Sequence, residues 1–358
     1  MSKNKNSSKQ DRKQRIFAII AIIIIAAMIA SLLLAGLTGC GLQTASSTDY
    51  IDRTSFYFDT VINVRIYGSQ DESILDDCME IASHYDSLFS ATKEGSDIWN
   101  INHSDSKSVT VDSDTISLLN TALYYANISG GAFNPALGSV LSLWDFTNDG
   151  NDNDNDHVIP DSDDIENALL HIDYNQIKID EKASTVTVED PDILIDLGAI
   201  AKGFIADKIK EYLVECNISS AIINLGGNVL LVGSKPGNSY FTIGVEKPFG
   251  SVNEYITSVP VSDKSVVTSG VYERYFELDG TIYHHIIDPQ TGYPTDNDLY
   301  SVTIVSDKSV DGDALSTTCF VLGADKGMEL IESLDGYEAA FVYSDYSISY
   351  SSGFPNKS

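Results

Sequence analysis

Strand patterns and helix patterns alternate irregularly along this sequence, and no strand–helix unit repeats at a regular spacing. A parallel, doubly wound sheet needs such repetition, whereas an irregular mixture is typical of α+β proteins. The clearest strand signal is a hairpin, in which Tyr275–Leu278 and residues 281–287 flank the turn dipeptide Asp279-Gly280. No linker rich in Pro, Gly or Ser divides the sequence after residue 54. We therefore predict an α+β fold with mixed, mainly antiparallel sheets and packed helices, forming one unit over residues 55–358.

Other segments carry weaker local signals. Apolar residues at positions 74, 75, 78, 81, 82, 85, 88 and 89 follow the spacing of one helix face. The patterns also predict helices over residues 113–128, about 201–216 and about 311–322, and a buried strand over residues 193–196. Residues 148–156 contain only Asn, Asp and one Gly. We predict that they form a solvated insertion, because the Gly and Glu positions of a calcium loop do not match.

The charge balance narrows the class of partner. The 358 residues include 22 Lys plus Arg and 52 Asp plus Glu, for a formal charge of −30. Nucleic-acid binding depends on Lys and Arg that neutralise phosphates, so no nucleic-acid partner is expected. An anionic substrate would need a cation as a bridge.

The N-terminus has the pattern of an export signal. Residues 1–15 carry six basic residues and a single acid, Asp11, and residues 16–34 are almost wholly apolar. Leu37-Thr38-Gly39-Cys40 resembles the lipobox of bacterial lipoproteins, where the signal is cut before a Cys that is then lipidated. We predict a signal peptide over residues 1–39, and a lipidated Cys40 with a tether over residues 40–54. The alternative is an uncleaved anchor helix, since the apolar run is long enough to span a bilayer. Either way, the domain would be exported and anchored at the extracytoplasmic face of the cell membrane.

Four polar clusters could carry chemistry. In residues 130–135, Gly-Gly-Ala-Phe-Asn-Pro, the glycines permit close approach of backbone to a ligand and Phe133 could stack on a planar ring. In residues 196–203, Lys202 lies in the first turn of a predicted helix, where backbone amides attract anions. Each also has a structural explanation, a helix-ending turn for the first and a solvated Lys for the second.

The other two clusters suggest proton transfer and metal binding. His284 and His285 are adjacent on a predicted strand, so they point to opposite faces, and one could reach a site while the other is solvated. Asp313 and Thr317 are spaced i and i+4 on a predicted helix, and their oxygens suit Mg²⁺. A structural His and a helix-capping acid are the alternatives. Together, the four clusters offer what cleavage of a nucleotide pyrophosphate needs.

The order of these motifs resembles the ApbE family. The resemblance extends from about Phe56 to Tyr350 and rests on six segments: residues 131–135 (GAFNP), 196–203 (DLGAIAKG), 224–228 (NLGGN), 268–270 (TSG), 285–292 (HIIDPQTG) and 313–317 (DALST). Members are FAD:protein FMN transferases and are often exported lipoproteins. The resemblance implies that residues 55–358 form an ApbE-like catalytic domain.

The resemblance also implies roles for individual residues. Mg²⁺ would be held by the Ala199 carbonyl, Asp313 and Thr317, and either His285 or Asp288 would act as the base. The residues expected to bind FAD are Phe58, Thr92, Ala132, Phe133, Asn134, Asp196, Lys202 and Ile287. Three of these depart from the family pattern: Phe58-Asp59-Thr60 replaces Met-Gly-Thr, Thr92 replaces Tyr, and Asn134 replaces Asp.

The implied activity is Mg²⁺-dependent transfer of FMN from FAD to a Thr or Ser hydroxyl of an exported acceptor, with release of AMP. The acceptor would be a flavoprotein of a membrane or extracellular electron-transfer system. Two alternatives remain open at this point. One is hydrolysis of FAD to FMN and AMP, and the other is a flavin-binding lipoprotein without catalysis.

Overall fold

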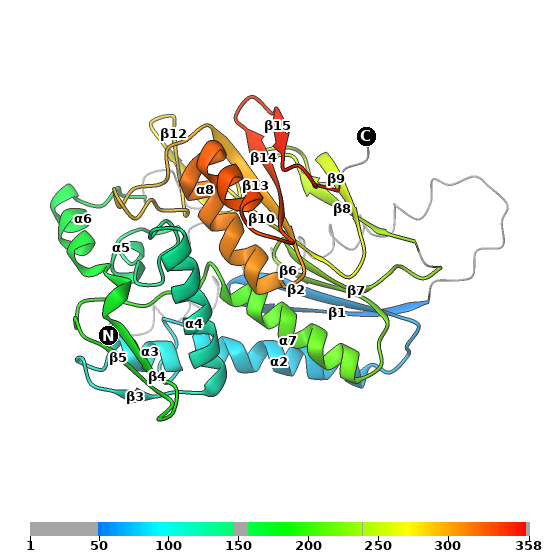
Figure 1. Cartoon of the computed structure of the whole chain (residues 1–358), viewed down its shortest axis with the longest axis horizontal. Coiled ribbons are helices and arrows are strands. Elements are labelled where there is room, and N and C mark those ends of the chain that lie inside the picture. The colour runs from blue at the N-terminus through cyan, green and yellow to red at the C-terminus, as the bar shows by residue number, and fades with distance from the viewer. Residues whose placement is uncertain (1–48, 147–156, 238, 356–358) are drawn as a thin grey trace, which may run out of the picture. The chain divides into compact units, whose positions relative to one another are not determined.

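The computed structural model describes residues 49–146, 157–237 and 239–355 (Figure 1). The predicted signal peptide, Cys40 and the 148–156 insertion lie outside the described residues. Strand β1 (Tyr50–Tyr57) begins inside the stretch predicted as a tether. Within the described ranges, no helix is both long and apolar enough to cross a membrane.

An eight-stranded sheet organises the fold, and every neighbouring pair in it is antiparallel. This sheet confirms the predicted α+β class. In spatial order its strands are β1, β2 (Thr60–Tyr67), β6 (Ser220–Leu225), β7 (Asn228–Gly233), β10 (Ser265–Gly270), β13 (Leu299–Ser306), β14 (Glu338–Tyr343) and β15 (Ile348–Tyr350).

Side chains of the large sheet alternate between two apolar cores, as the period of a strand requires. Leu230 of β7 belongs to the main core, whereas Leu231 faces the opposite side. On that side the sheet meets the hairpin of β8 (Phe241–Glu246) and β9 (Tyr255–Val261). Full burial of one such aliphatic side chain contributes about 1.5–3 kcal/mol, so both faces add to stability.

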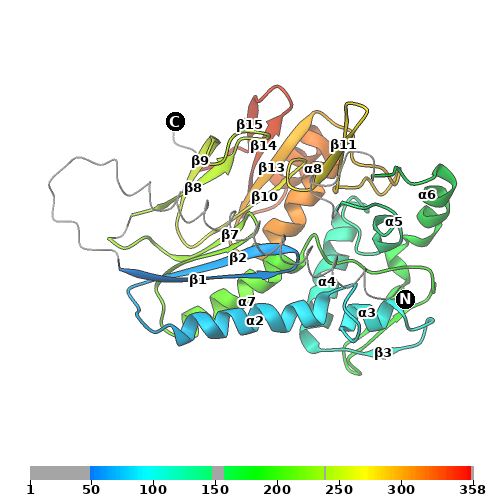
Figure 2. The same cartoon turned by 180° about the vertical axis from the view of Figure 1, so that it is seen from behind.

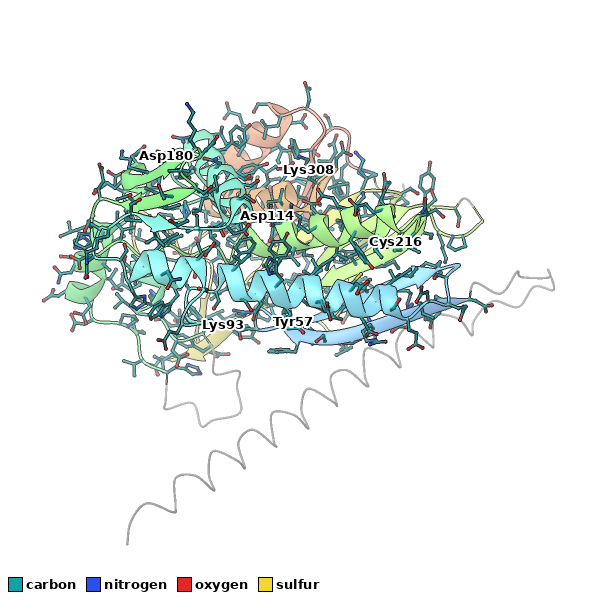
Figure 3. All side chains as sticks on the ribbon, turned by 90° about the horizontal axis from the view of Figure 1, so that it is seen from below. Tyr57, Lys93, Asp114, Asp180, Cys216 and Lys308 are labelled. Carbon is teal, nitrogen blue, oxygen red and sulfur yellow. The ribbon has the colours of Figure 1, made fainter. Side chains whose placement is uncertain are left out.

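Helices cover the main-core face of the sheet. Helix α7 (Ala201–Glu215) contacts β6, β7, α2 (Ser73–Phe89) and α8 (Ser309–Glu332), and α8 also packs on β10 and β13. Figure 2 shows these helices from behind, and Figure 3 shows α2 and α7 side by side, with Cys216 at the end of α7. Helix α4 (Ser113–Ile128) contacts α8. The N-terminal turns of α7 and α8 are thus brought together.

Smaller elements complete the described chain. One group contains α3 (Asp97–Asn102), β3 (Val109–Thr110), α5 (Gly138–Leu141), α6 (Ser162–Ala168), the 3₁₀ turns η1 (Leu169–His171) and η2 (Tyr174–Gln176), β4 (Ile177–Asp180) and β5 (Thr185–Val188). The predicted hairpin is confirmed as β11 (Tyr275–Leu278) and β12 (Thr281–His284), with positive φ at both Asp279 and Gly280. Strand β12 ends earlier than predicted, because the chain turns away after His284. Helix α8 is longer than predicted and continues across a kink at Gly323.

The prediction of a strand over residues 193–196 is wrong. Ile193 and Ile195 are buried as expected, but within the described part of the chain the segment pairs with no strand. Its backbone instead bonds to the side chain of Asn102, which donates to Ile195 O at 2.9 Å and accepts from Ile195 N at 2.8 Å. A distant side chain therefore satisfies the polar groups that a neighbouring strand would otherwise satisfy.

Candidate active site

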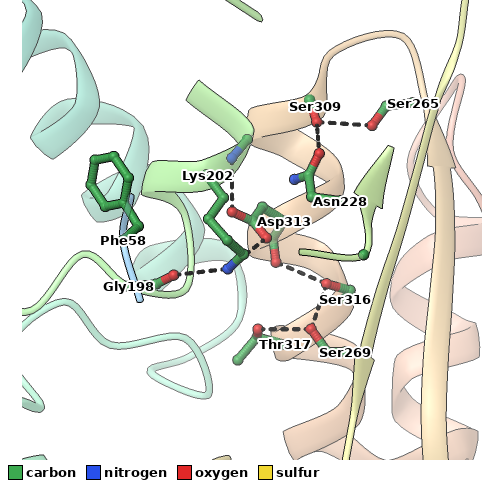
Figure 4. Close-up of polar contacts among 12 residues, drawn as sticks. Phe58, Gly198, Lys202, Asn228, Ser265, Ser269, Ser309, Asp313, Ser316 and Thr317 are labelled. Atoms are coloured by element: carbon green, nitrogen blue, oxygen red, sulfur yellow. Dashed lines mark hydrogen bonds and ion pairs between the residues drawn. The ribbon is translucent and has the colours of Figure 1, made fainter. Parts of the chain in front are cut away.

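The turn before α7 presents a cation toward α8. Asp196 Oδ1 accepts a hydrogen bond from Gly198 N at 2.8 Å, which fixes the turn. Lys202, in the first turn of α7, donates from Nζ to Gly198 O at 3.2 Å (Figure 4). Its ammonium also lies 3.5 Å from Asp313 Oδ1. Lys202 therefore joins the turn that contains Ala199 to the helix that contains Asp313.

Asp313 is a buried carboxylate, 3% exposed, in the first half of α8. Its Oδ2 accepts a hydrogen bond from Gly203 N at 2.9 Å. Burial raises the pKa of Asp313 above its usual range, although Lys202 acts in the opposite direction. A Cβ at Gly203 would lie 2.3 Å from Ser309 O, so only Gly allows the backbones of α7 and α8 to approach this closely.

Thr317 lies one turn beyond Asp313 and meets the end of β10. Ser269 Oγ is 3.2 Å from Thr317 Oγ1 and 2.8 Å from Ser316 Oγ. Ser316 Oγ donates to Asp313 O at 3.0 Å. These contacts hold the hydroxyl of Thr317 on the side of α8 where Asp313 lies (Figure 4).

The donor set at this cluster fits Mg²⁺. A carboxylate, a hydroxyl and a backbone carbonyl are hard oxygen ligands, and Mg²⁺ commonly takes few protein ligands. The buried amide Nδ2 of Asn228, which has no hydrogen-bond partner among the described residues, borders the Asp313 carboxylate and completes a polar lining. The assignment of Ala199, Asp313 and Thr317 as ligands stays a prediction.

A second group of possible metal ligands lies elsewhere. His171, Asp190 and Asp192 have ligand atoms within 4.8 Å of one another. However, His171 Nδ1 already contacts Asp190 Oδ2 at 2.7 Å, so a hydrogen bond between these two side chains explains the arrangement. An imidazole is also a poor match for Mg²⁺.

The two adjacent histidines have different surroundings. His284 is buried against Phe320, and its Nε2 lies 3.1 Å from Thr295 O. The expectation that the histidine outside the site is solvated is therefore wrong. His285 is half-buried, and its Nδ1 lies 3.2 Å from Arg274 O. Burial, reinforced by Arg274, lowers the pKa of His285 to about 3. Its imidazole is therefore neutral at pH 7, with the proton on Nδ1 facing the carbonyl and the lone pair on Nε2.

A cavity of about 350 Å³ lies beside the predicted site. It is lined by Gly130, Gly131, Ala132, Asn134, Ile172, Asp288, Pro289, Gln290, Val321, Leu322 and Lys326. Ala132, Asn134 and Asp288 were all predicted from the sequence, and the cavity brings them together. Asp288 Oδ1 accepts from Gln290 N at 2.8 Å, which stabilises the turn of the 285–292 segment.

The remaining predicted FAD residues differ in accessibility. Phe133 is 3% exposed and packs near Tyr125. Its ring is not available for stacking, and any contact with FAD would come from its backbone. Ile287 is likewise buried, whereas Thr92 is exposed. Phe58 is half-buried, lies at a turn with positive φ, and donates from its backbone N to Asp86 Oδ1 at 3.2 Å.

Sequence reasoning missed Glu273 and Arg274, which lie three and four residues after the 268–270 segment. Arg274 Nη2 donates to Asp59 O at 3.3 Å, and its own carbonyl accepts from His285 N at 3.1 Å. Glu273 is exposed at its surface, yet the protein around its carboxyl partly desolvates it, and this desolvation raises its pKa while Lys202 acts in the opposite direction. Two adjacent charged residues a few positions after the 268–270 segment were the available signal, but no spacing rule identified them.

Comparisons with known proteins identify the family of this chain. The sequence matches the ApbE family over residues 58–341. It is 36% identical to the FAD:protein FMN transferase of Treponema pallidum over 343 residues, covering 91% of this chain and 92% of that protein. It is 38% identical to an FAD:protein FMN transferase of Klebsiella pneumoniae over 282 residues, covering 78% and 85%.

Solved structures give the same result. The crystal structure of the ApbE protein of Thermotoga maritima superimposes with a TM-score of 0.78 at 32% identity, covering 86% of this chain and all of that one. The flavin transferase ApbE of Vibrio cholerae, at 23% identity and a TM-score of 0.75, shares the fold. The predicted family is therefore confirmed, and this chain belongs to the ApbE family.

Proposed function

We propose that this chain is an Mg²⁺-dependent FAD:protein FMN transferase that attaches FMN to a Thr or Ser hydroxyl of an exported acceptor and releases AMP. One observation carries the proposal. Asp313, Thr317 and Val321 are spaced four residues apart and share one face of α8. This face runs from the Lys202–Asp313 cluster to the cavity lined by Ala132, Asn134 and Asp288. The diphosphate of FAD would then lie at the Lys202–Asp313 cluster, and an attached nucleoside would lie in the neighbouring cavity.

The chain's own groups would bind and orient the diphosphate. Lys202 can donate to a phosphate oxygen, because its ammonium has three N–H donors and its contacts in the site are with one carbonyl and one carboxylate. Asp313, Thr317 and the Ala199 carbonyl would hold Mg²⁺. When bound, Mg²⁺ would offset the negative charge that develops on the leaving group.

The transfer reaction needs a proton acceptor. The acceptor hydroxyl oxygen forms a bond to the riboflavin-side phosphorus, and the bond from that phosphorus to the bridging oxygen breaks. The bridging oxygen leaves on AMP, and the hydroxyl proton passes to a base. His285 Nε2 is neutral and has a free lone pair, but its low pKa makes it a weak base. Glu273, whose pKa is raised, is a second candidate beside Asp288.

The proposal is tested by incubating the exported domain, which is the chain without its predicted signal peptide (residues 40–358), with FAD, Mg²⁺ and a candidate acceptor protein. Flavin fluorescence that stays with the acceptor in a denaturing gel, together with released AMP, is the expected result. Free FMN without labelled acceptor would indicate hydrolysis instead. Unchanged FAD would indicate a flavin-binding protein without catalysis.

We also propose that the enzyme is exported and anchored by a lipid on Cys40. The support is the basic N-terminus, the apolar run and the Leu37–Cys40 segment. An acceptor in a membrane or extracellular electron-transfer system would then lie on the same side of the membrane. Metabolic labelling with palmitate tests this anchor, because Cys40→Ala should remove the label, whereas an uncleaved anchor helix would carry no label on Cys40 in the wild type either.

A further inference from the structure

Asn228 is a buried amide beside the predicted metal site. It opens β7 and is 1% exposed. Its Oδ1 accepts a hydrogen bond from Ser309 Oγ at 2.5 Å. Ser309 Oγ in turn accepts from Ser265 Oγ at 3.0 Å (Figure 4). Three buried polar side chains from β7, α8 and β10 thus form one line of hydrogen bonds.

This line fixes which end of the amide faces Asp313. Ser265 donates to Ser309, so the single proton of Ser309 is directed to Asn228 Oδ1. Nδ2 is left facing the Asp313 carboxylate (Figure 4). The opposite orientation would place an amide oxygen against a carboxylate oxygen, which is repulsive.

Asn228 Nδ2 is a donor whose hydrogen-bonding capacity is not fully used by the described residues. Among the described residues it meets no partner in full hydrogen-bond geometry. The contact that it does make is with the Asp313 carboxylate, so an Asn at this position directs a donor at the predicted metal ligand. Asp313 is meanwhile held by Gly203 N and Lys202 Nζ. If Lys202 turns to the diphosphate of FAD, Gly203 and Asn228 are the neutral donors that still orient the carboxylate.

We propose that Asn228 is a positioning residue that orients the Asp313 carboxylate toward Mg²⁺, and that Ser309 and Ser265 hold the amide of Asn228 in its working orientation. The inference rests on the metal site of the proposed function. Hydrogen bonds that orient metal ligands typically change metal affinity by about 10- to 100-fold. A purely structural network would change stability and leave metal affinity unaltered.

The test measures Mn²⁺ binding by electron paramagnetic resonance on the exported domain, with and without FAD. Asn228→Leu keeps the approximate shape and removes the donor, and we expect its Mn²⁺ dissociation constant to rise about 10- to 100-fold. Ser309→Ala leaves the amide in place but free to turn, so a smaller rise is expected. Ser220→Ala is the matched control, since Ser220 is also a buried Ser whose Oγ has no partner among the described residues. Melting temperatures without metal report on folding.

The outcomes separate this inference from the function on which it rests. A folded Asn228→Leu protein that binds Mn²⁺ within twofold of the wild type overturns the positioning role and leaves the transferase proposal intact. If Asn228→Leu does not fold, Ser309→Ala decides, and an unchanged dissociation constant overturns the role. A wild-type domain that fails to bind Mn²⁺ in either condition overturns both.

Discussion

Gly203→Ala perturbs the predicted metal site by forcing two helices apart. A Cβ at residue 203 would lie 2.3 Å from Ser309 O and 2.6 Å from Val310 Cα. Both are backbone atoms, so no side-chain rotation relieves the overlap. Ordinary contact would require the first turn of α7 to move by roughly 1 Å, a small-to-large change inside a packed interface. The same movement lengthens the 2.9 Å bond from Gly203 N to Asp313.

The expected magnitude combines three effects. Overpacking costs about 1–3 kcal/mol, and weakening a hydrogen bond to a charged group costs up to about 1.5–3 kcal/mol. The higher helix propensity of Ala returns about 1 kcal/mol. The net loss is about 1.5–5 kcal/mol, which for a unit of about 300 residues lowers Tm by roughly 2–8 °C.

The assay pairs thermal unfolding with Mn²⁺ binding. Gly203→Ala should lower Tm and weaken Mn²⁺ together, because one contact serves both. Val214→Ala is the control, since Val214 lies on α7 with 54% exposure and should change neither quantity. A Gly203→Ala protein with wild-type Tm and wild-type Mn²⁺ affinity would refute the close-approach argument.

Three further substitutions test separate parts of the structure. Asp313→Asn should abolish FMN transfer but leave Tm without metal unchanged or higher, because a desolvated carboxylate is removed; undiminished transfer would disprove the metal assignment. Tyr125→Phe should lower the free energy of unfolding in urea by about 1–3 kcal/mol, because Tyr125 donates to Asp311 at 2.7 Å between α4 and α8, and an unchanged midpoint would contradict this. Burial lowers the pKa of His284 from its usual 6.5 to about 4, so His284 contributes stability that is present above pH 6.5 and is lost as pH falls toward 4. Urea titrations at several pH values should therefore show a weaker pH dependence for His284→Gln, and equal slopes would argue against it.

Sequence patterns predicted the elements whose conformation is set by residues close together in the sequence. The Asp279-Gly280 hairpin formed because both residues accept positive φ, and helix 113–128 matched its pattern at both ends. Residues 193–196 failed because an apolar run indicates burial without specifying a hydrogen-bond partner. The partner, Asn102, is 93 residues away. No periodicity in either segment signals that pairing.

The candidate site shows the same contrast between features set by nearby residues and contacts between distant segments. The i and i+4 spacing of Asp313 and Thr317 was visible in the sequence, because a helix converts that spacing into a shared face. The approach of Gly203 to Ser309 and the line from Ser265 to Asn228 were not visible, because each joins separate elements. Arg274 and Glu273 were missed for the same reason.

The burial of Asp313 links the unpredicted contacts to the predicted chemistry. Removing a carboxylate from water is unfavourable unless positive charge or donors replace the lost solvation. Gly203 N and Lys202 Nζ replace part of it, yet the pKa of Asp313 stays raised. The ionised carboxylate is thus more costly here than in water, and a divalent cation would remove that cost by binding the same oxygens. An apolar residue at position 313 would avoid that cost, so a costly carboxylate here is what the proposed ion site would require.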